Sequence, residues 1–109
     1  YSQNAALTNQ NDILDDLITA QKAAQDTLYN SLGASQKAVK IINGRMIPVM
    51  SEYLNLEGDQ QEILDGIVDD YNSYTDSIAE NSLTMQENTV AIEDNIQAIE
   101  DKTVEPPIW

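Results

Sequence analysis

Residues 78–99 read IAENSLTMQENTVAIEDNIQAI, a stretch in which apolar and amide residues return every seven positions. Two columns, three residues apart, continue this repeat upstream without a slip. They consist of Leu64, Ile67, Tyr71, Tyr74, Ile78, Asn81, Met85, Asn88, Ile92, Asn95, Ile99 and Lys102. Such a ladder is typical of a helix that buries one stripe against copies of itself. We therefore predict a mainly α fold, a parallel homotrimeric coiled coil preceded by an N-terminal helix and a short junction.

Three successive layers of this seam carry asparagine. A seam asparagine weakens a coiled coil but fixes its register, because the amide needs partners that only aligned chains supply. In a shifted assembly Asn81, Asn88 and Asn95 would face Ile or Met and lose about 1–3 kcal/mol each. The neighbouring column is mostly small or β-branched, as a core of more than two strands prefers. Its members are Val68, Thr75, Ser82, Thr89, Ile96 and Thr103.

The composition excludes several classes of function. The 109 residues carry 19 acidic and 5 basic side chains, a net charge of −14, which argues against nucleic-acid binding. No Cys or His is present, so thiolate chemistry, imidazole catalysis and the common zinc sites are excluded. No apolar run reaches membrane-spanning length, and adjacent acids such as Asp69-Asp70 lack the spacing of a calcium loop. We expect no enzyme, no metal site and no membrane partner.

Residues 1–33 are predicted to form the N-terminal helix. Leucines and isoleucines recur there at spacings of three, four and seven, between about Asn4 and Leu32. Asn9 and Asp12 have the spacing of an N-terminal cap, and Gly33 would end the helix in a left-handed conformation. Glutamines and asparagines interrupt the leucine stripe, so the packing register of this helix stays open.

Residues 34–58 form a junction with two competing interpretations. Asn43-Gly44 stands between two β-branched runs, which favours a β-hairpin with Pro48 at a strand end. The alternative is a pair of short helices broken at the same dipeptide, with Pro48 in a first turn. Lys37, Lys40 and Arg45 gather in this segment and form a possible docking patch for an acidic neighbour.

The coiled-coil stalk is predicted over residues 59–104. Asp59 and Glu62 have capping-box spacing at its start, and Pro106-Pro107 ends it. Residues 105–109 would then be a tail leading to a further segment, with Ile108-Trp109 as apolar contacts.

Ile78 and Met85 are each followed three residues later by Asn and then by Ser or Thr, as Asn81-Ser82 and Asn88-Thr89. This order resembles the stalk repeat of trimeric phage tail fibres, fibritin-type whiskers and trimeric autotransporter adhesins. The repeat departs from this pattern at Ile96 and Lys102. The resemblance implies a structural role in a virion appendage, at the virion or outside the cell, with the chain itself and other virion proteins as partners. It also implies an axial anion or water held by Asn81, Asn88 and Asn95, with no other cofactor.

Two alternatives remain open at this stage. Instead of a virion component, the chain could be a monomeric antiparallel helical bundle that acts as a binding adaptor. It could also be the stalk of a bacterial surface adhesin. A further question concerns Leu83, Val90 and Val104, which lie on the outer face of the stalk. One interpretation is that they are ordinary scattered apolar surface residues. The other is that the N-terminal helix folds back and packs on them as an outer layer, as in viral fusion subunits.

Overall fold

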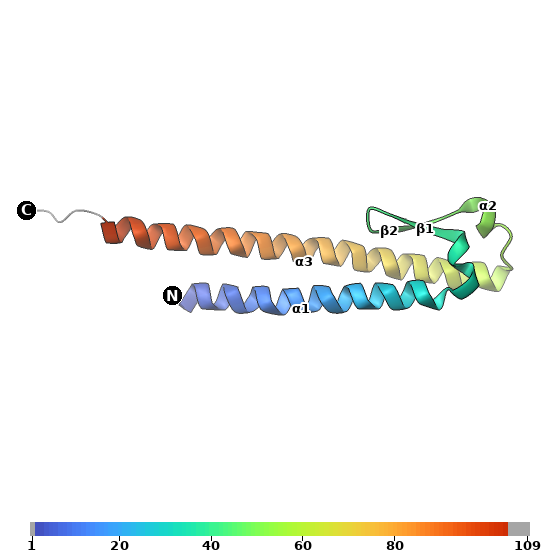
Figure 1. Cartoon of the computed structure of the whole chain (residues 1–109), viewed down its shortest axis with the longest axis horizontal. Helices are drawn as coiled ribbons and strands as arrows, with labels where there is room; N and C mark the ends of the chain where they lie inside the picture. The colour runs from blue at the N-terminus through green and yellow to red at the C-terminus, as the bar shows by residue number, and fades with distance from the viewer. Residues whose placement is uncertain (1, 105–109) are drawn as a thin grey trace, which may run out of the picture.

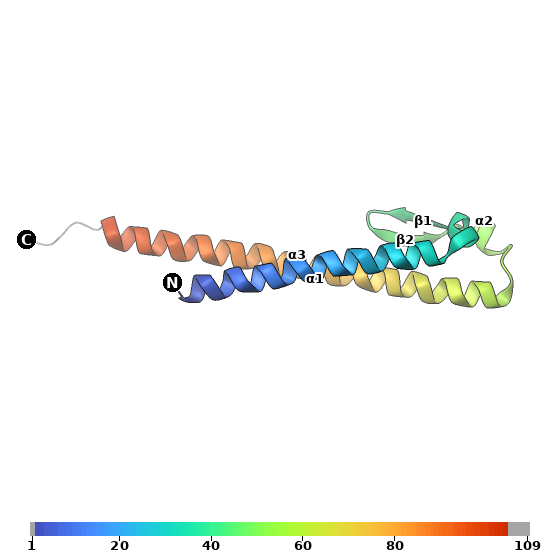
Figure 2. The ribbon, with the colours of Figure 1, turned by 60° about the horizontal axis from the view of Figure 1, so that its bottom comes forward.

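The computed structural model describes residues 2–104 as two long antiparallel helices with a small β-hairpin at the end where they are joined (Figure 1). The molecule is a rod with extents of 83 × 20 × 15 Å. Figure 2 shows that the two helices cross at a shallow angle and that the hairpin lies beside them at one end. In chain order the elements are α1 (Ser2–Ser31), the 3₁₀ helix η1 (Gly33–Ala38), β1 (Val39–Ile42), β2 (Arg45–Pro48), α2 (Met50–Tyr53) and α3 (Gly58–Val104).

Helix α1 confirms the predicted N-terminal helix, but its start differs from the prediction. Asn9 and Asp12 lie inside the helix, which already begins at Ser2, so the proposed cap at Asn9 is wrong. The predicted end is correct: Gly33 has φ 54°, the left-handed conformation that glycine adopts at little cost. The chain then turns through η1 into the hairpin.

The β-hairpin interpretation of the junction is confirmed. Strands β1 and β2 pair antiparallel from Val39 opposite Pro48 to Ile42 opposite Arg45. Asn43 and Gly44 have φ angles of 52° and 78°, as a two-residue type I′ turn requires at both central positions. Pro48 takes the last position of β2, where its missing N–H does not interrupt the ladder.

The apolar core lies where this hairpin meets the two long helices. Its fully or nearly fully buried members are Leu32, Ala38, Val39, Met46 and Leu64. The side-chain amide of Asn72 on α3 fastens β2 to the helix, because it accepts the Met46 N–H at 2.8 Å and donates to the Met46 carbonyl at 3.0 Å. Asn72 thus satisfies both backbone groups of one residue, as a neighbouring strand would.

Helix α3 starts with a different cap from the one predicted. The N–H of Gln61 donates to the Glu57 carbonyl at 2.9 Å, which makes Glu57 the N-cap residue. The Glu57 N–H donates to Oε1 of Gln60 at 3.2 Å, the reach-back bond of a capping box. The box predicted at Asp59 and Glu62 is therefore wrong by two residues. The tail at residues 105–109 and the side chain of Val104 lie outside the described part of the chain.

Candidate interaction site: the amide seam

Helix α1 carries a heptad repeat of its own, and this repeat faces α3. Every side chain of the repeat that the structure describes is buried or half-buried, and most of the residues between them are exposed. The repeat consists of Asn4, Leu7, Asn11, Leu14, Ile18, Gln21, Gln25, Leu28 and Leu32, at alternating spacings of three and four. This spacing marks one stripe of a coiled-coil helix.

The three seam asparagines of α3 bind amides of α1. Together these residues form what we call the amide seam: Asn4, Asn11, Gln21 and Gln25 of α1 with Asn81, Asn88 and Asn95 of α3. Nδ2 of Asn95 donates to Oδ1 of Asn4 at 2.9 Å, and Nδ2 of Asn81 donates to Oε1 of Gln21 at 3.1 Å. Nδ2 of Asn88 lies 2.9 Å from Oδ1 of Asn11 and 2.9 Å from Oε1 of Gln10.

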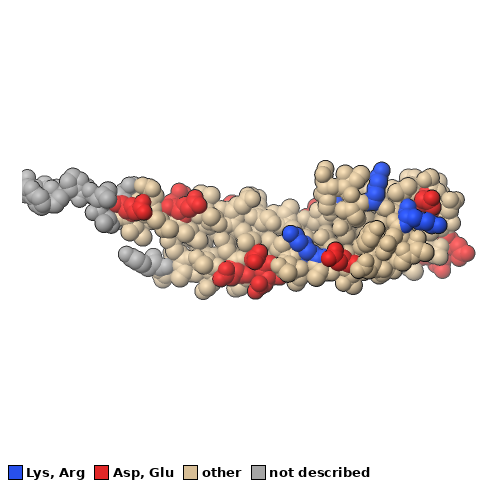
Figure 3. Space-filling view, viewed as in Figure 1, with Lys and Arg blue, Asp and Glu red and all other residues tan. Residues whose placement is uncertain are grey.

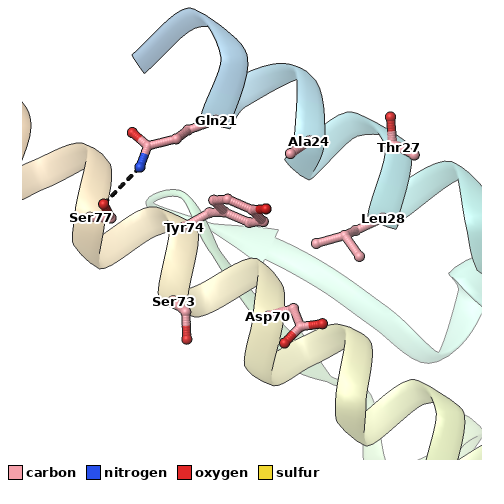
Figure 4. A pocket seen from close by; sticks show the side chains of 8 residues that line it. All are labelled: Gln21, Ala24, Thr27, Leu28, Asp70, Ser73, Tyr74 and Ser77. Carbon is pink, nitrogen blue, oxygen red and sulfur yellow. Dashed lines mark hydrogen bonds between the residues drawn. The ribbon is translucent and has the colours of Figure 1, made fainter. Parts of the chain in front are cut away.

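Glutamines extend the seam toward the hairpin end. Gln21 donates from Nε2 to the Ser77 hydroxyl at 2.7 Å, a contact visible in Figure 4. Gln25 donates from Nε2 to the Thr75 hydroxyl at 2.8 Å and to the Tyr71 carbonyl at 3.0 Å. Gln21 and Gln25 are each only 8% exposed, so these bonds replace water that the amides lose on burial.

Polar and apolar layers alternate in a way that fixes the register. Asn4 and Asn11 are seven residues apart, as are their partners Asn95 and Asn88. At this register Leu7 lies level with Ile92. A shift of one heptad in either direction would break the pairs that Asn95 and Asn88 form with Asn4 and Asn11. Among the described residues, no buried side-chain nitrogen or oxygen lacks a partner, so the observed register satisfies them all.

The structure places the predicted oligomer seam against α1 of the same chain. Leu64 is fully buried in the core, and Ile67 and Tyr71 pack around it. Farther along α3, Tyr74, Ile78, Met85 and Ile92 are half-buried, and Ile99 is 36% exposed. The parallel trimer stays a prediction, and it would need the same column that α1 covers here. An axial anion or water would likewise need the asparagine N–H groups that now bind α1.

Sequence reasoning missed the α1 half of the seam. In the sequence, Asn11 and Gln21 interrupt the leucine stripe, whereas in the structure they belong to it and meet amides across the interface. Their positions could have indicated that they belong to the buried stripe, because they keep the same alternating spacing of three and four as the leucines.

The predicted docking patch is partly engaged within the chain. Nη1 of Arg45 lies 2.7 Å from Oδ1 of Asp76, and Nζ of Lys37 lies 4.0 Å from Oε2 of Glu52. Lys40 is exposed on β1. Figure 3 shows basic side chains toward the hairpin end and acidic side chains along the rod. Exposed ion pairs of this kind add little stability. Docking of an acidic neighbour at this patch stays a prediction.

The N-terminal helix does not cover the outer apolar residues of α3. Leu83 is 57% and Val90 is 54% exposed, because α1 packs on the amide column instead. Of the two interpretations, cover by α1 is therefore wrong for these two residues, and the interpretation as scattered surface residues holds for them.

Two tyrosines near the hairpin have a raised pKa. The Tyr53 hydroxyl donates to Oδ1 of Asp65 at 2.9 Å, and this hydrogen bond to a carboxylate raises the pKa of Tyr53. Burial raises the pKa of Tyr71, with smaller contributions from Asp26 and Tyr29. Both shifts favour the neutral phenol, so neither hydroxyl is prepared to act as a base.

Neither a metal site nor a membrane span is found within residues 2–104. The described residues hold no group of three or more Asp or Glu side chains that could bind a metal ion. None of the described helices is long and apolar enough to cross a bilayer.

Comparison with known proteins returns no relative. No family model matches the chain, and neither a curated protein nor a solved structure is similar to it. The amide seam and the rod that it holds together are therefore the features from which a function can be argued.

Proposed function

We propose that this chain is a structural, non-catalytic segment that spaces or connects other parts of a virion appendage, such as a phage tail fibre, whisker or fibre connector. The observation that carries the proposal is the amide seam. It holds α1 and α3 in one register along the length of α1 within an 83 Å rod, and such a device sets length and direction.

The charge distribution supports a structural role. A net charge of −14 keeps a long rod soluble and discourages unspecific contacts. The core at the hairpin end closes the helical pair and sets the angle at which the chain turns back. Both features suit a stiff connector, and the virion itself is proposed from the stalk resemblance.

The stalk resemblance adds a second form to this proposal, a parallel homotrimer, which would replace the amide seam within one chain. In that form three copies of α3 would share the column of Asn81, Asn88 and Asn95, and α1 would have to leave it. If α1 stays, copies must join through another face. Sedimentation equilibrium distinguishes a mass of three times 12.1 kDa from the mass of one chain.

A second candidate function is favoured by one specific observation. Helix α1 folds back onto α3 and satisfies the seam amides within one chain, which is the arrangement expected of a monomeric helical-hairpin adaptor. A monomer at micromolar concentration that keeps its full helical content would favour the adaptor over the fibre segment.

The virion role is tested by locating the chain on particles. An antibody raised against the purified chain should label the appendages of virus particles prepared from the source, at a constant distance from the particle. The proposal would be overturned if the antibody labelled cells or soluble fractions and left purified particles unlabelled.

A further inference from the structure

The hairpin covers one face of α3, and the same face continues uncovered beyond the hairpin turn (Figure 1). Asn72 and Asp76 bind the hairpin on this face, through the backbone of β2 and through an arginine of β2. Residues seven positions apart share one face of a coiled-coil helix. Leu83 and Val90 stand seven and fourteen positions after Asp76, so they continue the face that the hairpin occupies, and both are exposed.

A shallow hollow lies on this uncovered part of α3. It has a volume of about 470 Å³, is open to solvent, and is lined by Leu83, Gln86, Glu87, Val90, Ala91 and Asp94. The hollow therefore combines apolar side chains with one amide and two carboxylates. Gln86 stands fourteen positions after Asn72, so the face that binds β2 through one amide presents a second amide here.

Strand β1 has a free backbone edge of the kind that such an amide binds. Both backbone groups of Met46 bind Asn72 on the side of β2 away from β1, so Met46 and Ile41 opposite it form a non-hydrogen-bonded pair. The N–H and C=O of Ile41 therefore point away from β2, and no described residue pairs with them. A side-chain amide can bind this edge as Asn72 binds the edge of β2.

The side chains of β1 complement those of the hollow. Ile41 and Ile42 are 40% and 44% exposed, so β1 presents apolar groups to water. Lys40 between them and the core is exposed and has no ion-pair partner among the described residues. Glu87 and Asp94 supply carboxylates at the hollow. Apolar groups would therefore meet apolar groups, and a lysine would meet carboxylates.

The geometry points to a second copy of this chain as the occupant, with β1 of one copy docked into the hollow on α3 of the next. Gln86 binds the Ile41 backbone of the neighbour, and Lys40 of the neighbour lies toward Glu87. Because the two surfaces differ, each copy binds one neighbour through its hairpin and another through its hollow, and copies join head to tail. Neither surface uses the column of Asn81 and its equivalents, so the contact is compatible with the amide seam and with a trimeric stalk. This inference rests on the proposed structural role and deepens it by naming how copies join.

The contact is small, and the association of two free copies is weak. Residues 83–94 span about 17 Å of a helix that is about 10 Å wide, so the buried area is roughly a few hundred Å² per copy. Interfaces below about 1,200 Å² in total are typically transient. Repetition along a fibre compensates for this, because neighbours held in one assembly have a high effective concentration. At physiological salt, repulsion between acidic groups more than about 8 Å apart is largely screened.

Disulfide trapping tests this contact in the full chain, which contains no cysteine. A chain with Ile42→Cys and a chain with Val90→Cys are mixed at high concentration under mild oxidation, and mass spectrometry should find a disulfide that joins one of each. Either variant alone should stay mostly unlinked, because residues 42 and 90 meet each other and not themselves. Ile42→Cys mixed with Ile13→Cys, at an exposed site on α1, is the matched control and should link only at the background level.

A charge reversal completes the test. Lys40→Glu in the Ile42→Cys chain should lower the yield of the mixed disulfide roughly fivefold, and Glu87→Lys with Asp94→Lys in the Val90→Cys chain should restore it. Lys22→Glu makes the same charge change on α1 and should leave the yield unchanged. All substituted side chains are exposed, so helical circular dichroism should not change.

Three results would overturn the inference. The mixed pair links no better than the control pair, the charge reversal restores nothing, or Ile42→Cys alone links as well as the mixture, which would indicate symmetric pairing of two β1 strands. None of these results alters the labelling of particles, so the structural role is tested separately.

Discussion

The side-chain amide of Asn88 donates to Oδ1 of Asn11 at 2.9 Å, across 77 residues of sequence and from one long helix to the other. Asn88 is only 9% exposed, so this bond is made where water is largely excluded. Asn11 in turn donates from Nδ2 to the Thr89 hydroxyl at 3.3 Å. A polar network between residues so far apart in sequence forms only when the chain has turned back at the correct position.

The Gln21–Asn81 layer offers a direct measure of what the seam contributes. Gln21→Leu removes the acceptor for Nδ2 of Asn81 and the donor to Ser77, and should lower the free energy of unfolding by about 1–3 kcal/mol. Gln21→Leu combined with Asn81→Leu makes an apolar layer and should recover most of that loss. Urea unfolding of the wild type, both single variants and the double variant measures this coupling. Simple addition of the two single losses would show that the pair does not interact.

Leu64 and Leu83 form a matched pair of leucines on the same helix. Leu64 is 0% exposed and Leu83 is 57% exposed. Leu64→Ala should lower the free energy of unfolding by about 2–5 kcal/mol through lost contacts and a cavity, while Leu83→Ala should change it by no more than about 0.5 kcal/mol. Thermal and urea unfolding of the two variants provide the comparison. Equal losses would mean that Leu83 is covered in solution.

Asn72 is predicted to control the docking of the hairpin. Asn72→Ala removes both hydrogen bonds to the backbone of Met46 and should cost about 1–3 kcal/mol. Hydrogen exchange at the Met46 amide should speed up, with the middle of α3 unchanged. Asn55→Ala, an exposed asparagine in the turn before α3, is the control. Unchanged protection at Met46 would contradict the bracing role of Asn72.

The hydrogen bond between Tyr53 and Asp65 predicts a pH dependence at alkaline pH. Because the folded pKa of Tyr53 is raised, the interaction stabilises the fold below the ordinary tyrosine pKa. This contribution is lost as the pH rises through the raised pKa of the folded state. Asp65→Asn should return the titration of one tyrosine toward its ordinary range, measured by tyrosinate absorbance. An identical titration curve in the variant would show that the two side chains do not interact.

Local signals made much of the fold predictable. The Asn43-Gly44 dipeptide indicated the hairpin because both positions need a positive φ, and Gly33 indicated the end of α1 for the same reason. The heptad of α3 identified the buried face of that helix. These features depend on residues near one another in the sequence, and a single chain displays them directly.

The partner of the seam was harder to predict. A heptad column indicates which face of a helix is buried but not what covers it, because Asn88 needs only a partner for its amide, and Asn11 of α1 supplies one here. The decisive pattern lay in α1, where Asn and Gln residues stand at positions of the leucine repeat. When the two helices are aligned antiparallel, these residues come opposite the asparagines of α3. The cap at Glu57 was missed for another reason: Gln60 reaches back to a residue type that seldom caps a helix.

The antiparallel packing of α1 on α3 is the central claim, and an intramolecular distance tests it most directly. Asn9 and Val90 are exposed and lie at the same level of the rod, so spin labels at Asn9→Cys and Val90→Cys can be placed without disturbing the seam. In labelled chains diluted with unlabelled protein, pulsed electron resonance should give a single distance of about 30 Å, set by two helix diameters and the label arms. A distance beyond ~60 Å, expected if α1 pointed away from α3, would contradict the hairpin and the amide seam together.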